Sequence, residues 1–414
     1  MNTNNVMNVM NAMNTMDPMN GKNAMSINTK NAMNTINTKN TMKKLIRVCC
    51  IFVIAALLAS VVGCVRPTSA TPDPSTTQGE NASNASNASN ASNASNASNA
   101  SNASNTSNTS DETITLSLGH VLTEDHFYHI AYLKWAELVK ERTNGRIIIE
   151  IFPNGVLGGE RELTEAVQLG TLDITMPLAA VMGNFIDSMR IFDLPYVFNS
   201  REEAWSFLDG ENGKEMLDSL ESIGLIGLAF WENGLRSVHT KDVEVHVPSD
   251  LTGLKIRTME NTTHMNTFRA WGANPVAMAW GEVYTAVQQG LVNGVENPLA
   301  PMYQSRIHEV TRFIALTQHC YMPAPLFISA ATWAKLSAED QKIIKETAVE
   351  VGAYQRQLSV EADVEILQKL KDEGVTVVED IDKKLWREAA QPVYDSYIQE
   401  YGDDMLKKVE AMRG

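Results

Sequence analysis

The stretch that most constrains the fold is residues 113–176, where short strand-like runs alternate with amphipathic helical segments. The strand-like runs are residues 113–118, 146–152 and 172–176, and the helical segments are residues 129–143 and 159–169. Strands that alternate with helices at this spacing favour right-handed crossovers and a mainly parallel sheet. We therefore expect an α/β fold.

The same alternation restarts further along the chain. The expected elements are a helix at 201–222, a strand at 224–231, a crossing segment at 235–240, a strand at 255–257, helices at 263–271 and 281–289, a strand near 294 and a return strand at 323–329. An α/β body of about 300 residues is expected to divide into two cores. The pattern predicts lobe I at 111–234 and lobe II at 235–322.

The last part of the chain, residues 323–414, holds the return strand and C-terminal helices. Between them, residues 337–373 form a long amphipathic segment without proline, capped by Ser337 at its start and ended by Gly374. At 1.5 Å per residue this helix would be about 50 Å long, enough to bridge two lobes. The expected architecture is a hinged clamshell.

The N-terminus carries a targeting signal. Residues 1–41 are rich in Met, Asn and Thr, and we interpret them as a non-native extension ahead of Met42. Basic residues at 43–47 precede an apolar run of 15 residues at 48–62, which is too short for a comfortable membrane span and typical of a signal peptide. We expect a signal peptide at 42–63.

Small residues directly precede Cys64, as in a bacterial lipobox, so we expect cleavage before Cys64 and lipidation of this cysteine. The alternative is an uncleaved membrane anchor.

Residues 64–110 follow, with Asn-Ala-Ser repeated eight times at 81–104. This composition predicts a disordered tether that reaches roughly 35–40 Å. Its triplets also match the N-glycosylation pattern, but a lipobox favours a plain spacer.

Composition excludes several classes of function. Acidic residues outnumber basic ones by 48 to 28 from Cys64 onward, which argues against nucleic-acid binding. Cys320 is the one cysteine of the folded body, so we expect neither an internal disulfide nor a metal site. An anionic ligand would need a local group of arginines against this acidic background.

Arg257 is the strongest candidate for such a role, because it ends a short strand-like run at 254–257. Downstream come Trp280, an acidic helix start and the turn Asn297-Pro298. The arginine fork matches a carboxylate bidentately, and an asparagine amide can add an oriented donor and acceptor. The pattern predicts carboxylate recognition; the alternative is a structural arginine.

Several blocks together resemble the solute-binding receptors of TRAP (tripartite ATP-independent periplasmic) transporters, over nearly all of residues 113–412. They are Gly-Val-Leu-Gly-Gly-Glu-Arg-Glu at 155–162, Val-Gln-Leu-Gly-Thr-Leu-Asp at 167–173, Asp-Leu-Pro-Tyr-Val-Phe at 193–198, Trp-Glu-Asn-Gly-Leu-Arg at 231–236, Leu-Lys-Ile-Arg at 254–257, Gly-Ala-Asn-Pro at 272–275, Trp-Gly-Glu-Val-Tyr at 280–284 and Gly-Val-Glu-Asn-Pro at 294–298. The resemblance implies a two-lobed periplasmic-binding-protein clamshell of type II-like topology, without a cofactor.

The resemblance also assigns roles to single residues. Arg257 corresponds to the selectivity arginine that pairs with the ligand carboxylate, and Arg236 to a second arginine at the cleft. Asn297 corresponds to the asparagine that holds the same carboxylate, and Trp280 to an aromatic wall. These assignments are expectations from the family pattern.

Four further positions bear on the choice of ligand. Glu160 matches an acidic ligand contact of the sialate branch, although a carboxylate at a helix start is also favourable by itself. His120 lies at the first strand-to-helix turn, where open α/β sheets bind ligands. Leu178 and Glu260 depart from the sialate pattern, which favours a C4-dicarboxylate or a sugar acid such as a uronate over sialic acid.

We therefore predict a lipid-anchored, monomeric receptor on the extracytoplasmic face of the bacterial cell membrane. It would bind a small organic acid and deliver it to the permease subunits of a TRAP transporter for ion-coupled uptake. The sequence has no Walker loop, Gly-x-Ser-x-Gly elbow or His-Glu-x-x-His motif. The alternatives are an extracellular enzyme acting on acidic sugars and a clamshell receptor that serves an ABC transporter or a sensor kinase.

Overall fold

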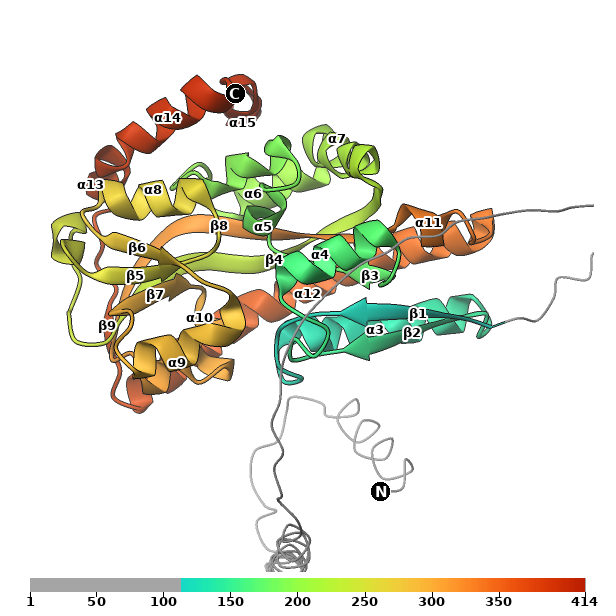
Figure 1. The fold of residues 1–414 in the computed structure, drawn as a ribbon, viewed down its shortest axis with the longest axis horizontal. Coiled ribbons are helices and arrows are strands. Elements are labelled where there is room, and N and C mark those ends of the chain that lie inside the picture. Colours follow the sequence, from blue (N-terminus) through green and yellow to red (C-terminus); the bar gives the residue numbers. More distant parts are fainter. Residues whose placement is uncertain (1–112, 414) are drawn as a thin grey trace, which may run out of the picture. The chain divides into compact units, whose positions relative to one another are not determined.

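The computed structural model describes residues 113–413, so the expectations for the extension, the signal peptide, Cys64 and the Asn-Ala-Ser repeats lie outside the described residues. The described chain forms a mixed sheet of nine strands, in which β2-β1-β3-β8-β4-β7-β5-β6 lie side by side and β9 joins β8 (Figure 1). Within this part of the chain, no helix is both long and apolar enough to cross a membrane.

Lobe I confirms the predicted strand-helix alternation. Its parallel strands are β1 (Ile114–Gly119), β2 (Ile147–Phe152) and β3 (Ile174–Thr175), and the crossover helices are α3 (Phe127–Arg142) and α4 (Glu160–Leu169). Gly170 ends α4 in the left-handed conformation at φ +72°, which favours glycine. The carboxyl ends of β1 and β3 therefore meet at one edge of the lobe, where α4 begins.

Two long antiparallel strands join the lobes. They are β4 (Leu225–Thr240) and β8 (Phe313–Ser329), and both are longer than the segments expected at 224–231 and 323–329. The Asn233-Gly234 pair does not stop β4, because a register shift between Glu232 and Gly234 absorbs it and Gly234 adopts φ +122°. The expected chain crossing is therefore a continuous two-stranded ribbon.

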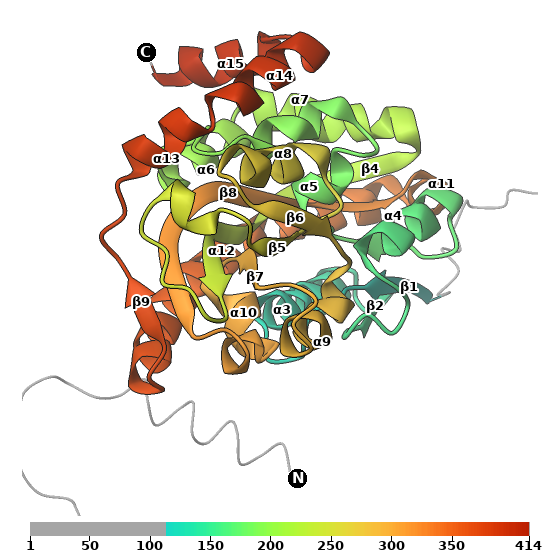
Figure 2. The ribbon, with the colours of Figure 1, turned by 60° about the vertical axis from the view of Figure 1, so that its left-hand side comes forward.

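Lobe II carries the strands β5 (Lys255–Thr258), β6 (Asn274–Ala277) and β7 (Gly294–Asn297). Helix α8 (Thr262–Ala270) covers one face of these strands, whereas α9 (Val283–Gln288) and α10 (Leu299–Gln304) cover the other (Figure 2). Strand β6 was not expected from the sequence. The predicted helix at 281–289 is divided into the 3-10 turn η4 (Trp280–Glu282) and α9.

The single helix expected at 201–222 is also divided, because Gly210 adopts an extended backbone conformation between α6 and α7. The remaining elements are α5 (Ala179–Met182), η1 (Asp187–Asp193), α6 (Arg201–Asp209), α7 (Glu211–Ser219), η2 (Leu220–Ile223), η3 (Pro248–Leu251), η5 (Ile307–Glu309), α11 (Ala330–Trp333), β9 (Thr376–Val378), α13 (Lys383–Ala389), α14 (Gln391–Tyr401) and α15 (Asp404–Arg413).

The long helix is α12 (Ala338–Asp372), with Ser337 as its N-cap as predicted. It packs against α3 and β4 of lobe I and against α10 of lobe II, so it bridges the lobes. Gln355 fixes its middle to the ribbon by bonding both the backbone N–H and the carbonyl of Glu232, at 2.8 and 2.6 Å. Gly352 permits the close approach of the Trp231 ring.

The two separate cores expected from chain length are only partly present. One large apolar cluster extends from lobe I through β4, β8 and α12 to Ile256 and Phe268 of lobe II. A smaller cluster around Val283 and Val295 fills the space between α9 and the sheet. The shared strands and the shared helix join the first core across the lobes, which makes the hinge a packed element instead of a flexible linker.

Candidate ligand-binding site

Two adjoining cavities lie where the carboxyl ends of β1, β3, β5 and β7 meet. The inner cavity is lined by Val121, Leu122, Tyr128, Glu160, Leu178, Asn233, Arg236, Arg257, Met259, Trp280, Asn297 and Pro301. The outer cavity is lined by Val121, Gly159, Glu160, Arg161, Glu162, Val181, Asn184, Arg257, Met259, Glu260, Met278, Ala279, Trp280 and Gly281. Both lobes contribute to each cavity, so this is the cleft of the clamshell.

The lobes are closed over this cleft. Asn184 of lobe I donates to the Glu260 carbonyl at 2.9 Å, and Asn261 of lobe II donates to the Ala180 carbonyl and to Asp193 Oδ2, both at 2.8 Å. The enclosed volumes are about 30 Å³ for the inner cavity and about 50 Å³ for the outer one. A ligand larger than a few water molecules therefore requires the lobes to move apart before it can enter.

Arg257 projects from the end of β5 into this space and is 2% exposed. Its Nε and Nη2 donate to the Met278 carbonyl at 3.0 and 2.6 Å, while Nη1 has no partner among residues 113–413. The guanidinium carbon lies 5.6 Å from the centre of the Trp280 ring. Burial lowers the pKa of Arg257 to about 10, with Glu296 opposing the shift, so the side chain remains charged at neutral pH.

Arg236 also lines the inner cavity, but its charge is already neutralised. It is fully buried, and its Nε and Nη2 bond Glu296 Oε2 and Oε1 at 2.6 and 2.8 Å. Burial opposes ionisation of Glu296, yet Arg236 and His319 hold the pKa of this carboxyl well below its usual value. Arg236 therefore lies at the cleft as expected, but it does not add free positive charge there.

Asn297 and Tyr128 line the inner cavity, and each has a buried polar atom without a well-formed hydrogen bond. Asn297 ends β7, and its Oδ1 has no partner in the described chain, while its carbonyl accepts from His239 Nε2 at 3.1 Å. Tyr128 lies in the first turn of α3, and its hydroxyl is likewise buried without a well-formed hydrogen bond within residues 113–413, although the Asn233 side chain is close enough to oppose the rise of its pKa. Buried polar atoms usually have partners, so these two need one from a ligand or from water.

Glu160 begins α4 and lines both cavities. Its Oε1 accepts from the Leu178 amide at 3.1 Å, and no ion pair within the described residues involves it. Burial raises the pKa of Glu160, while the Leu178 amide and Arg257 act in the opposite direction. Glu260 lines the outer cavity with an exposed side chain, and Leu178 forms part of the inner wall.

His120 does not occupy the expected position. Its Nδ1 accepts from the Leu122 amide at 3.3 Å and its Nε2 faces His129 Nδ1 at 3.1 Å, and the residues that line the two cavities do not include it. Burial, together with His129, lowers its pKa to about 3, so the ring is neutral. In this conformation the His120 ring orders the turn after β1, and its contact with a ligand stays a prediction.

Three lining or supporting residues were not singled out from the sequence. Glu296 and Asn233 lie within blocks that resemble the receptors, so their position in those blocks was the available signal. No such signal was available for Tyr128, because an aromatic residue in a helix usually belongs to the core.

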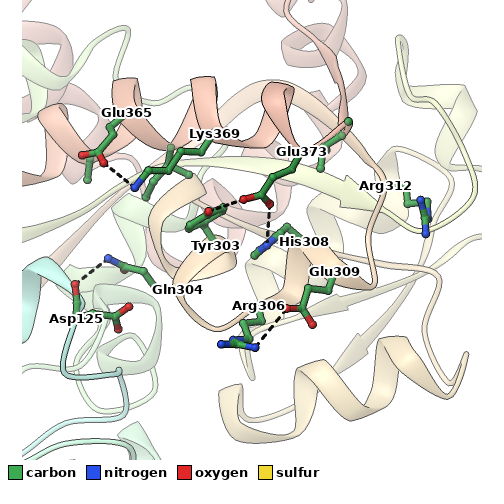
Figure 3. Close-up of a pocket in the computed structure, with 14 residues that line it drawn as sticks. Asp125, Tyr303, Gln304, Arg306, His308, Glu309, Arg312, Glu365, Lys369 and Glu373 are labelled. Atoms are coloured by element: carbon green, nitrogen blue, oxygen red, sulfur yellow. Dashed lines mark hydrogen bonds and ion pairs between the residues drawn. The ribbon is translucent and has the colours of Figure 1, made fainter. Parts of the chain in front are cut away.

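A larger hollow of about 800 Å³ lies elsewhere, between α10, η5 and the C-terminal half of α12 (Figure 3). Its polar side chains mostly bond one another. The pairs are Lys369–Glu365 at 2.6 Å, Tyr303–Glu373 at 2.6 Å, His308–Glu373 at 3.3 Å and Arg306–Glu309 at 3.6 Å. This hollow contains none of the residues expected to bind a ligand, so its size does not make it the better candidate.

Comparison with known proteins identifies the family of this chain. Residues 118–400 match the family described as bacterial extracellular solute-binding protein, family 7. The chain is 34% identical over 302 residues to the 2,3-diketo-L-gulonate-binding periplasmic protein YiaO of Escherichia coli strain K12, covering 72% of this chain and 92% of the relative. It is 31% identical over 304 residues to the C4-dicarboxylate-binding periplasmic protein DctP of Rhodobacter capsulatus, covering 72% and 91%.

A solved structure shows the same fold. The TRAP periplasmic solute-binding protein from Polaromonas sp. JS666, bound to D-erythronate, superposes with a TM-score of 0.71 at 36% identity and covers 73% of this chain and 100% of that chain. The match confirms the predicted two-lobed α/β fold, and the class of relatives confirms the prediction of a binding protein instead of an enzyme. The chain belongs to family 7 of the bacterial extracellular solute-binding proteins, the extracytoplasmic receptors of TRAP transporters.

Proposed function

We propose that this receptor binds an organic acid through Arg257 and Asn297 and delivers it to a TRAP permease for ion-coupled uptake. The observation that carries the proposal is Arg257 Nη1, a charged donor without a protein partner in the described chain, at a cavity formed by both lobes. A buried guanidinium with a free donor is best satisfied by a carboxylate.

The ligands named for similar proteins support two ligand classes for this chain. The proteins similar to this chain are named for 2,3-diketo-L-gulonate and C4-dicarboxylates, and one is seen with D-erythronate. All of these are small acids with a carboxylate and further polar groups. A sugar acid or a C4-dicarboxylate is therefore the ligand class that we propose.

Mass spectrometry of the small molecules that copurify with the folded protein tests this proposal without assuming a ligand. We expect an organic acid that is retained by the wild type and absent from Arg257→Ala. A non-acidic copurifying ligand, or equal retention by both proteins, would contradict the assigned role of Arg257.

The lipid anchor is a separate proposal that rests on the residues before Cys64. Cys64→Ala should release the receptor from the membrane fraction without changing its affinity, because the described binding body begins at residue 113. Retention of a processed Cys64→Ala protein on membranes would favour the uncleaved anchor. We further propose that the receptor is a monomer, which light scattering of the soluble form checks.

A further inference from the structure

We infer that the cleft is built for a single carboxylate flanked by hydroxyl groups, so the ligand is a polyhydroxy monocarboxylate such as an aldonate or a uronate, and Tyr128 is one of its contacts. This inference rests on the proposed function and goes beyond it, because it decides between the two ligand classes. Charge and hydrogen-bonding capacity lead to it independently.

The charge balance leaves one cation for the ligand. The inner cavity has two arginines, but Glu296 takes the charge of Arg236 through two bonds shorter than 3 Å. Arg257 has no carboxylate within bonding distance in the described chain and uses two of its nitrogens on a neutral carbonyl. One ligand carboxylate is thus compensated by Arg257, and a second would be buried without a counter-charge.

The other charges around the cleft are unfavourable for a second carboxylate. Glu160 is shared by both cavities, and Glu162 and Glu260 line the outer one. Arg161 also lines the outer cavity, but its Nε bonds Glu165 at 3.0 Å and its side chain is exposed. A dicarboxylate anchored on Arg257 would therefore direct its far end toward acidic side chains.

The polar atoms without partners point to hydroxyl groups. Asn297 Oδ1 has no partner in the described chain and can only accept, whereas the Tyr128 hydroxyl can donate and accept. The Glu160 carboxylate also only accepts, and the Leu178 amide already donates to its Oε1. Burial raises the pKa of Tyr128 well above its ordinary value, so its proton is retained. A ligand hydroxyl can donate to Asn297 or Glu160 and accept from Tyr128, whereas a carboxylate, which only accepts, can donate to neither and would leave Asn297 Oδ1 unpartnered.

Matched pairs of acids test the inference directly. Erythronate and meso-tartrate differ only in a terminal CH2OH or carboxylate, and galactonate and galactarate differ in the same way. Calorimetry at pH 8 should show that an aldonate binds at least about tenfold tighter than its dicarboxylate partner, because a like charge at about 4 Å costs several kcal/mol even at an effective dielectric constant of 20. Equal or tighter binding of a dicarboxylate would overturn the inference while leaving the proposed function intact. Failure of every acid to bind would overturn both.

Two variants separate the charge argument from the hydroxyl argument. Glu160→Gln should reduce the ratio of the affinity for an aldonate to the affinity for its matched dicarboxylate. An unchanged ratio of these affinities would contradict the role of the Glu160 charge. Tyr128→Phe should weaken aldonate binding about three- to tenfold, the usual effect of one hydrogen bond. Tyr132→Phe is the matched control, because it removes another buried, unpartnered hydroxyl from the same helix but does not line the cavity. Equal affinities of the two phenylalanine variants would refute the assignment of Tyr128.

Discussion

Replacement of Arg257 by lysine tests the geometry of the cleft more sharply than replacement by alanine. In the structure, Nε and Nη2 both donate to the Met278 carbonyl, and this leaves Nη1 without a partner among residues 113–413. The rigid guanidinium is thus held by one edge and presents the other. A lysine keeps the charge but has one flexible ammonium group, which cannot hold the carbonyl through two nitrogens and present a fixed third donor.

The expected loss follows from the bonds that change. A hydrogen bond between charged groups contributes about 1.5–3 kcal/mol, which corresponds to about a tenfold to hundredfold change in affinity. We therefore expect Arg257→Lys to bind the copurifying acid nearly as weakly as Arg257→Ala in titration calorimetry. Arg269→Lys, at an exposed position on α8, is the control and should bind like the wild type. Wild-type affinity in Arg257→Lys would refute the reasoning, because charge without geometry would then be sufficient.

Three further predictions concern stability. Glu296→Gln leaves the buried guanidinium of Arg236 without its counter-charge, so urea unfolding should show that the free energy of unfolding falls by about 3–5 kcal/mol. A fall of less than about 1 kcal/mol would mean that the pair is not buried as described. The pKa of His120 is about 3 in the folded protein against an ordinary 6.5, so between these pH values the unfolded chain binds one more proton than the folded chain. The free energy of unfolding of the wild type should therefore fall as the pH decreases from 6.5 toward 3. His120→Gln should show a shallower fall when urea unfolding is measured over the same pH range. Gly352→Val should lower the melting temperature, because even a Cβ at this position would lie 3.0–3.1 Å from the Trp231 ring. An unchanged melting curve would contradict this prediction and show that α12 can shift away from the ring.

Elements with a strong local pattern were predictable from the sequence. The helix expected at 337–373 is α12, with Ser337 as its N-cap and Gly374 directly after its C-cap Glu373, because capping and the lack of proline act within a few residues. Strand β1 and helix α3 were found for the same reason, since each shows its own periodicity.

Elements that depend on neighbours were not predictable in the same way. Strand β4 continues through Asn233-Gly234 because β8 and then β7 pair with it along its length, and a bulge accommodates a local signal that usually marks a turn. Strand β6 has no strong pattern of its own and forms against the free edge of β5. Pairing with a distant strand outweighs local preference in both cases.

The alternation of strands and helices and the positions of Arg257 and Asn297 at strand ends were predictable from local patterns, because each depends on residues close together in the chain. The expectation of two lobes came from the length of the chain and from the family resemblance. The electrostatic character of the cleft became visible only in the folded chain. Glu296, 60 residues from Arg236, neutralises it, His120 is held by His129, and Tyr128 reaches the inner cavity. Coulomb and hydrogen-bond energies depend on distance in space and on burial, so they became known only when the strands from both lobes had been brought to one edge.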